Sequence, residues 1–142
     1  MRSPVSDPAL TIGSMLTDDL REWLTATLRY PVLAVIAEDG WPSQSVMWFD
    51  LDPERDDTIV MNTMVRRIKY RQLQRDPRVS LLFEDGLRWV AMRGTVELDA
   101  HRERGMASIQ HLARRYESDP GRFDGQERVI IRMRVEKVIR HD

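Results

Sequence analysis

Short apolar runs separated by turn signals constrain this chain more than any other feature of its sequence. Residues 30–37 are β-branched and apolar, residues 38–40 (EDG) are typical of a tight turn, and residues 43–51 alternate between two faces. This succession predicts a β-hairpin, because such a turn folds one strand back on the last. A second hairpin is predicted in the same way by strands 79–83 and 89–98 around the turn 84–86.

The remaining periodicities complete a mainly β chain with a few α-helices. They predict strands over 58–63 and 128–139, and helices over about 18–28, 66–75 and 101–117. Residues 1–16 show no sustained period, so we expect a flexible N-terminal lead followed by a single domain over 17–142. Six strands joined mainly by hairpins predict a six-stranded antiparallel barrel.

Composition excludes several classes of protein. The 142 residues include no Cys, which removes disulfide scaffolds, zinc fingers and thiol catalysis. With 22 Lys and Arg against 23 Asp and Glu, the formal net charge of −1 argues against a globally basic nucleic-acid binder. The longest apolar run, residues 32–37, is far shorter than the roughly 20 residues that span a bilayer, and the first 15 residues lack the pattern of a signal peptide. We therefore expect a soluble, cytoplasmic protein that binds neither membrane nor nucleic acid.

The densest charge feature is the segment 66–78, RRIKYRQLQRDPR, which carries six basic residues against one Asp. It begins where a predicted strand passes into a predicted helix, so helix N–H groups, the helix dipole and the cationic heads can converge on a phosphate. A solvated basic face is the alternative, and spacing alone does not separate the two. The chain contains neither GxGxxG nor a Walker pattern, which excludes Rossmann and P-loop sites.

Two strands offer a surface for a flat ligand. Residues 61–63 precede the basic segment, and residues 44–48 lie on the strand expected to pair with them. Backbone amides and small polar side chains can bind the edges of an aromatic ring system there, while Met and Trp supply apolar contact. The same residues also fit an ordinary barrel interior, so both interpretations stay open.

No catalytic side chain can be assigned from the sequence. The three His residues lack the spacing of metal ligands, so no metal site is expected, and there is no GxSxG elbow. The acidic residues within 50–57 resemble a metal loop only loosely and are most simply a turn. The lack of an acid–base constellation favours an enzyme in which a bound cofactor carries the reaction, because the protein then needs mainly to bind and orient.

Four segments together resemble a known family: SVMWFDL at 45–51, TIVMNT at 58–63, RRIKYRQLQRDPRVSLLFEDG at 66–86 and RWVAMRGTVEL at 88–98. They are similar to the pyridoxamine 5′-phosphate oxidase-like split barrels, and more narrowly to the flavin/deazaflavin branch that uses coenzyme F420. The resemblance runs from about Ile12 to Ile139. It implies a six-stranded split barrel of the FMN-binding type, which forms a homodimer with cofactor sites between the subunits.

The resemblance also implies which residues bind the cofactor. Its phosphate would be held by the basic residues after the third strand: Arg66, Arg67 and Lys69. Its ring system would lie against the second and third strands: Ser45, Val46, Met47, Trp48, Asn62 and Thr63. The partner subunit would contribute from the hairpin near the fifth strand: Arg88 and Trp89.

From this we expect an oxidoreductase that transfers a hydride from reduced coenzyme F420 to a conjugated small-molecule acceptor. The tail of that cofactor is anionic beyond its phosphate, and three arginines continue the basic segment far enough to meet it: Arg71, Arg75 and Arg78. The alternatives are an FMN-dependent oxidoreductase of the same class and a non-catalytic cofactor- or tetrapyrrole-binding protein. The dimer is also expected from the residues themselves, because both faces of the second and fifth strands carry large apolar groups, Trp48 and Trp89 among them.

Overall fold

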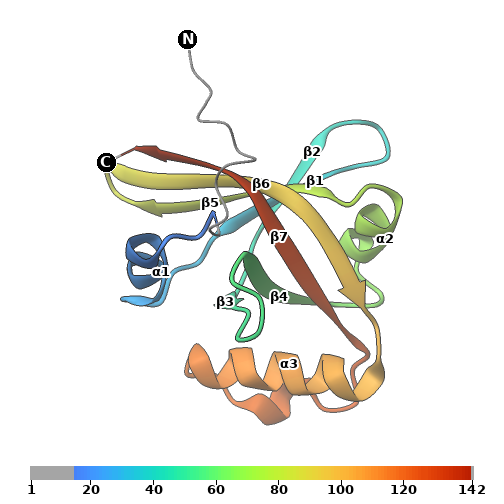
Figure 1. Ribbon diagram of the computed structural model, residues 1–142. Coiled ribbons are helices and arrows are strands. Elements are labelled where there is room, and N and C mark those ends of the chain that lie inside the picture. The colour runs from blue at the N-terminus through green and yellow to red at the C-terminus, as the bar shows by residue number, and fades with distance from the viewer. Residues whose placement is uncertain (1–14, 142) are drawn as a thin grey trace.

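A single antiparallel sheet of seven strands forms the body of the molecule, with the helices packed around it (Figure 1). The computed structural model describes residues 15–141. Its strands are β1 (Val32–Ile36), β2 (Pro42–Val46), β3 (Asp50–Leu51), β4 (Thr58–Met64), β5 (Arg78–Asp85), β6 (Arg88–Asp99) and β7 (Arg128–His141). Its helices are α1 (Asp18–Thr25), α2 (Ile68–Arg75), α3 (Arg102–Arg115) and the 3₁₀ helix η2 (Pro120–Phe123). The mainly β class and both predicted hairpins, β1–β2 and β5–β6, are confirmed.

One short stretch of the chain contributes a strand to each edge of the sheet and thereby links the two edges. Neighbouring strands follow the order β2–β1–β5–β6–β7–β4–β3, so β2 and β3 lie at opposite edges although only residues 47–49 separate them in the chain. There are thus seven strands where six were predicted, because the strand expected over 43–51 divides. The predicted pairing of residues 44–48 with 61–63 was wrong, since β2 pairs with β1 and it is β3 that pairs with β4.

Phe49 explains why the strand divides. Its N–H donates to Tyr116 Oη at 3.2 Å, and its carbonyl oxygen accepts from Arg115 Nε at 2.9 Å. Side chains from the end of α3 therefore take both backbone groups that a neighbouring strand would otherwise need. The chain leaves β1 at this point and joins β4.

The core lies inside the curved sheet and is covered at one end by α1. Phe49 and Phe83 meet there edge to face, with ring centroids 4.9 Å apart. The short α1 buries the apolar residues that its spacing predicts: Leu20, Trp23 and Leu24. Leu16, which the sequence placed in the N-terminal lead, is only 2% exposed and belongs to this core. The rest of the predicted lead, residues 1–14, lies outside the described residues.

A close approach of two backbones lets the long strands β6 and β7 bend. Their register shifts at Arg93 and Gly94. A Cβ at Gly94 would stand 2.0 Å from the Arg134 carbonyl oxygen, so a larger residue does not fit without movement of the backbone. Both strands then continue toward α3, which lies across their far end (Figure 1).

α3 packs on β7 and β4 through a separate apolar cluster. It buries Ile109, Leu112 and Ala113. Near its start, Gly105 touches the backbone of Arg128, where a Cβ would stand 2.0 Å from the carbonyl oxygen. Within residues 15–141, no helix is long and apolar enough to cross a membrane.

Candidate functional site

A cleft of about 390 Å³ opens between the sheet and the segment formed by α3 and η2. One wall consists of the end of β2, the residues that follow it, β4 and the start of α2. The other consists of α3, η2 and the first residue of β7. A volume of this size suits a small-molecule ligand. In the part of the chain that the structure describes, no group of three or more His, Cys, Asp or Glu side chains could hold a metal ion.

The cleft brings together eight of the eleven residues that the sequence predicts for a cofactor site: Ser45, Val46, Met47, Trp48, Asn62, Thr63, Arg67 and Lys69. What they bind stays a prediction. Arg66 is exposed and does not line the cleft. Arg88 and Trp89 lie at the other end of β6, where the Arg88 guanidinium carbon stands 5.1 Å from the centre of the Trp23 ring and Trp89 stacks on His141. In a single chain these two residues are not part of the cleft, so their contribution from a partner subunit stays a prediction.

Four cationic side chains line the cleft, and none of its lining residues is acidic. Three of them, Arg67, Lys69 and Arg128, form a cluster in which the charges repel one another. Burial, together with smaller contributions from repulsion by Arg67 and Arg128, lowers the pKa of Lys69 to about 8. Burial also lowers the pKa of Arg128 to about 10, with a contribution from Arg67. The Lys69 ammonium donates to Met47 Sδ at 3.1 Å, a weak acceptor that leaves the charge uncompensated. Cations that are held close together although burial and mutual repulsion disfavour their charged forms are typical of an anion-binding site.

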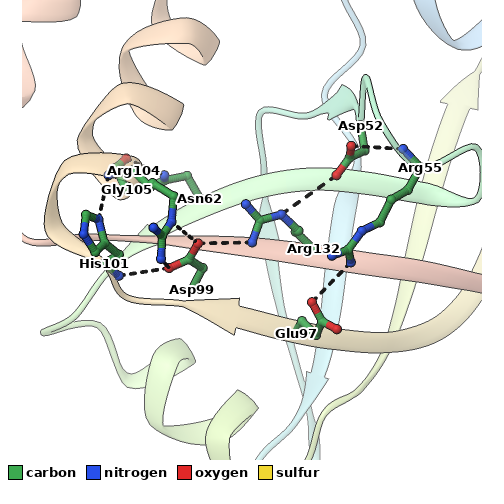
Figure 2. A network of polar contacts seen from close by, with 9 residues as sticks. All are labelled: Asp52, Arg55, Asn62, Glu97, Asp99, His101, Arg104, Gly105 and Arg132. Atoms are coloured by element: carbon green, nitrogen blue, oxygen red, sulfur yellow. Dashed lines mark hydrogen bonds and ion pairs between the residues drawn. The ribbon is translucent and has the colours of Figure 1, made fainter.

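The acidic residues near α3 are paired with other arginines outside the cleft. The pairs are Asp99 with Arg104 and Arg132, Asp52 with Arg132, and Glu97 with Arg55 (Figure 2). Asp99 accepts from Arg104 Nε at 2.8 Å, and this contact holds the pKa of the carboxyl well below its usual range. The network ties the first turn of α3 to β6 and β7, and its carboxylates do not reach the cations of the cleft.

Aromatic rings form an apolar part of the cleft. Trp48 stacks on Tyr116 with ring centroids 5.1 Å apart and an interplanar angle of 8°, and it meets Phe123 edge to face at 6.1 Å. Tyr116 is fixed in turn, because its hydroxyl accepts from the Phe49 N–H and donates to the Arg29 carbonyl oxygen at 2.5 Å. Trp48 is therefore held in one orientation beside the three cations.

Sequence reasoning missed Met64 of β4 and the whole opposite wall of the cleft, which consists of Ile109, Leu112, Arg122, Phe123 and Arg128. Arg128 is the first residue of β7 and lies opposite Met64 in the β4–β7 ladder. The basic residues of this strand alternate with apolar ones from Val129 to Val135, as in a strand with one solvent-facing side. No local pattern distinguishes Arg128 from them, because it reaches the cleft through the pairing of two strands that are far apart in the sequence.

A protein-family model described as pyridoxamine 5′-phosphate oxidase matches residues 16–142. The chain belongs to this family. The resemblance drawn from the sequence is thereby confirmed, and with it the split-barrel fold, which binds flavins in this family. A search of the curated proteins found no significant match.

Solved structures similar to this pyridoxamine 5′-phosphate oxidase family member include an F420 reductase. It shares 28% sequence identity at a TM-score of 0.71, over 83% of this chain and 94% of that chain. The conserved hypothetical protein Rv2991 from Mycobacterium tuberculosis shares 23% identity at a TM-score of 0.75, over 93% and 88% of the two chains. General Stress Protein 26 from Bacillus anthracis shares 17% identity at a TM-score of 0.63, over 85% and 92%. The last two likenesses show the fold alone.

Proposed function

We propose that this member of the pyridoxamine 5′-phosphate oxidase family is an oxidoreductase that depends on coenzyme F420. When bound in its reduced form, that cofactor supplies a hydride to a conjugated small-molecule acceptor. The observation that carries the proposal is a cleft in which the cluster of Arg67, Lys69 and Arg128 lies beside an aromatic wall, with no acidic residue in the lining. The likeness to an F420 reductase, at 28% identity, supports the choice of cofactor.

The cleft fits a ligand that joins a phosphate to a flat ring system. Arg67, Lys69 and Arg128 would hold the phosphate, because charge-assisted hydrogen bonds to an oxyanion are among the strongest that a protein makes. Trp48 and Phe123 would border the ring system and keep water away from it. The chain's own contribution is then to bind, to orient and to exclude solvent.

A deazaflavin also calls for positive charge beyond its phosphate. Arg71 and Arg75 line a neighbouring depression of about 720 Å³ beside α2, whose other rim is the acidic β1–β2 turn. The sequence also predicts Arg78 for this role, but Arg78 makes two hydrogen bonds of 3.0 and 2.8 Å to the carboxylate of Asp76, which favours a pairing within the protein. Arg71 and Arg75 are the residues that favour coenzyme F420 over FMN, which ends at its phosphate.

Titration with both cofactors at two salt concentrations tests the proposal. Coenzyme F420 should bind more tightly than FMN, and the difference should shrink as salt rises, because exposed charges are screened beyond about 8–10 Å at physiological ionic strength. Reduced F420 with a panel of quinones should then show recovery of the oxidised cofactor's absorbance. Tighter binding of FMN at low salt would favour the FMN-dependent alternative. Binding without turnover of any acceptor would favour a non-catalytic binding protein.

We also propose that two copies assemble through the outer face of the sheet. Apolar residues from five adjacent strands stand in one row of the ladder: Val46, Val32, Leu82, Ala91 and Ile139. Val46, Leu82 and Ile139 are 66%, 40% and 43% exposed in the single chain. An apolar row of this kind on a sheet face is typical of an interface.

A two-fold axis through the middle of this row would set the β7 end of one copy over the β2 end of the other. Trp89 stands two residues from Ala91 on the same face, so the arrangement brings Trp89 of the second copy toward the cleft residues that follow β2. Light scattering at low micromolar concentration should give twice 16.7 kDa for the wild type and 16.7 kDa for Leu82→Asp. A monomeric wild type would contradict the dimer and the shared site.

A further inference from the structure

A buried amide connects three elements at the cleft. Asn62 on β4 is 7% exposed, and its Nδ2 donates to the Gly105 carbonyl oxygen of α3 at 3.1 Å (Figure 2). Its Oδ1 accepts from Arg128 Nε of β7 at 2.9 Å. The two contacts use opposite ends of one amide and therefore fix its orientation. The sequence predicts Asn62 as a ligand of the cofactor ring, yet both of its polar atoms are already engaged within the protein.

The backbone holds these three residues in register. Asn62 pairs with Ile130 in the β4–β7 ladder, and Arg128 precedes Ile130 by two positions, so both side chains emerge on the same face. Gly105 sits against the peptide group of Arg128, where a Cβ would stand 2.0 Å from the carbonyl oxygen. Arg128 is thus fixed at its backbone by α3 and at its guanidinium by Asn62.

The groups that hold the guanidinium of Arg128 are neutral. Besides the bond to Asn62, Arg128 Nη1 donates to Gln126 Oε1 at 2.9 Å, and its guanidinium carbon lies 5.2 Å from the centre of the Phe123 ring. Outside the cleft, Arg104 and Arg132 are instead oriented by the carboxylate of Asp99. A carboxylate orients a guanidinium but cancels its charge, whereas an amide orients it and leaves the charge for another anion.

We propose that Asn62 is a positioning residue, which orients Arg128 toward a bound anion without neutralising it. The inference rests on the proposed function in that the anion is the phosphate of the cofactor. Because Asn62 acts through Arg128, its replacement should weaken a ligand that carries the phosphate and spare the same ring system without one.

FMN and riboflavin make this comparison directly, since they differ only in the phosphate. Wild-type protein should bind FMN more tightly than riboflavin in a flavin fluorescence titration. Asn62→Asp keeps the size and the contact with Arg128, loses the donor to the Gly105 carbonyl oxygen and adds a negative charge, and it should weaken FMN binding by about tenfold or more. Its riboflavin affinity should change by less than about twofold. Asn62→Leu removes both hydrogen bonds of the amide without adding a charge and should weaken FMN binding by a smaller factor.

Gln74→Glu is the matched control, because it adds the same charge on the exposed side of α2 and should leave both affinities unchanged. A merely structural role for Asn62 predicts that Asn62→Asp, which keeps a contact with Arg128 but can no longer donate to the Gly105 carbonyl oxygen, changes FMN and riboflavin affinity by the same factor. An equal change of both affinities, or an Asn62→Asp protein that retains FMN, would overturn the inference. Thermal denaturation identifies variants that do not fold. If Asn62→Leu does not fold, the affinities of Asn62→Asp alone test the positioning role.

Inorganic phosphate separates this inference from the proposed function. A wild type that binds neither flavin nor coenzyme F420 would contradict the proposed function only. Calorimetric titration with phosphate should then still show binding to the wild type and none to Asn62→Asp. Phosphate that binds both proteins equally, or that does not bind the wild type, would overturn the positioning role of Asn62.

Discussion

Replacing Lys69 by Met tests whether the buried charge that serves ligand binding lowers the stability of the folded protein. In the folded chain the pKa of Lys69 falls from 10.5 to about 8, because of burial and the nearby arginines. Below pH 8 the amine is charged in both the folded and the unfolded chain, and the folded state bears the full cost of that charge. Between about pH 8 and 10.5 the folded chain releases the proton first, so the cost disappears and stability rises with pH.

The size of the effect follows from the same numbers. A pKa lowered from 10.5 to about 8 corresponds to roughly 3 kcal/mol of preference for the neutral amine. Since the side chain is only half-buried and water screens its charge, we take about half of this, or 1–2 kcal/mol. Met has a similar length and no charge, so Lys69→Met should raise the free energy of unfolding of the ligand-free protein by about 1–2 kcal/mol at pH 7.

Urea denaturation followed by Trp fluorescence measures this difference at pH 7 and again near pH 10. The gain should be largest at pH 7 and fade toward pH 10. The same variant should bind FMN or coenzyme F420 about tenfold or more weakly, because one charge-assisted contact to the phosphate is lost. Lys137→Met is the control, since Lys137 is exposed on β7 and outside the cleft, and it should change neither quantity.

Two results would refute this reasoning. A Lys69→Met protein that is less stable than the wild type at pH 7 would show that the charge of Lys69 is not buried at a cost. Equal effects of Lys69→Met and Lys137→Met on cofactor affinity would mean that the basic segment is only a solvated face.

Three further changes test other parts of the structure. Arg128→Gln should weaken FMN binding about tenfold in a fluorescence titration, and Arg66→Gln, outside the cleft, should change it by less than about twofold; similar effects would contradict the cluster of three cations. Tyr116→Phe removes a hydroxyl that bonds to Phe49 and Arg29, and chemical denaturation should show a loss of about 1–3 kcal/mol, whereas no loss would mean that these bonds do not hold the divided strand. Gly94→Ala should cost at least about 2 kcal/mol, because its Cβ would stand 2.0 Å from the Arg134 carbonyl oxygen, and an unchanged melting temperature would refute the close approach.

The features that the sequence predicts well depend on local signals. The turns of the two hairpins contain Gly40 and Gly86, whose φ values of 88° and 68° are in the region that favours glycine. Helical spacing correctly predicts a helix within residues 101–117, where α3 forms. Both signals lie within a few residues of the structure they specify, so they can be recognised in one sequence.

The division of the strand after β2 could not be predicted in this way. Burial alternates without interruption through Met47 and Phe49, as it would in one continuous strand. The break depends on Tyr116 and Arg115, which lie more than sixty residues away in the sequence. α1 ends earlier than predicted for a related reason, because the Arg29 side chain donates to the Trp23 carbonyl oxygen at 2.9 Å.

The candidate site shows the same limit. The basic segment contains Arg67 and Lys69 and is visible in the sequence, as are the polar and apolar residues of β2 and β4. Arg128 is not, because its role depends on strand pairing and on the neutral acceptors around it. Membership of the basic segment does not by itself place a residue in the cleft. Arg66 lies outside the cleft, and Arg78 pairs with Asp76.

The cations of the cleft also have a consequence for the rates of binding. The protein has a net charge of −1, so the molecule as a whole does not attract an anion from a distance. The positive field of the cleft extends only about 8 Å at physiological ionic strength. The association rate of a phosphate-bearing ligand should therefore depend only weakly on ionic strength, because long-range steering contributes little. The three cations should instead lower the dissociation rate. A ligand with a phosphate is then distinguished from one without by its longer residence time in the cleft.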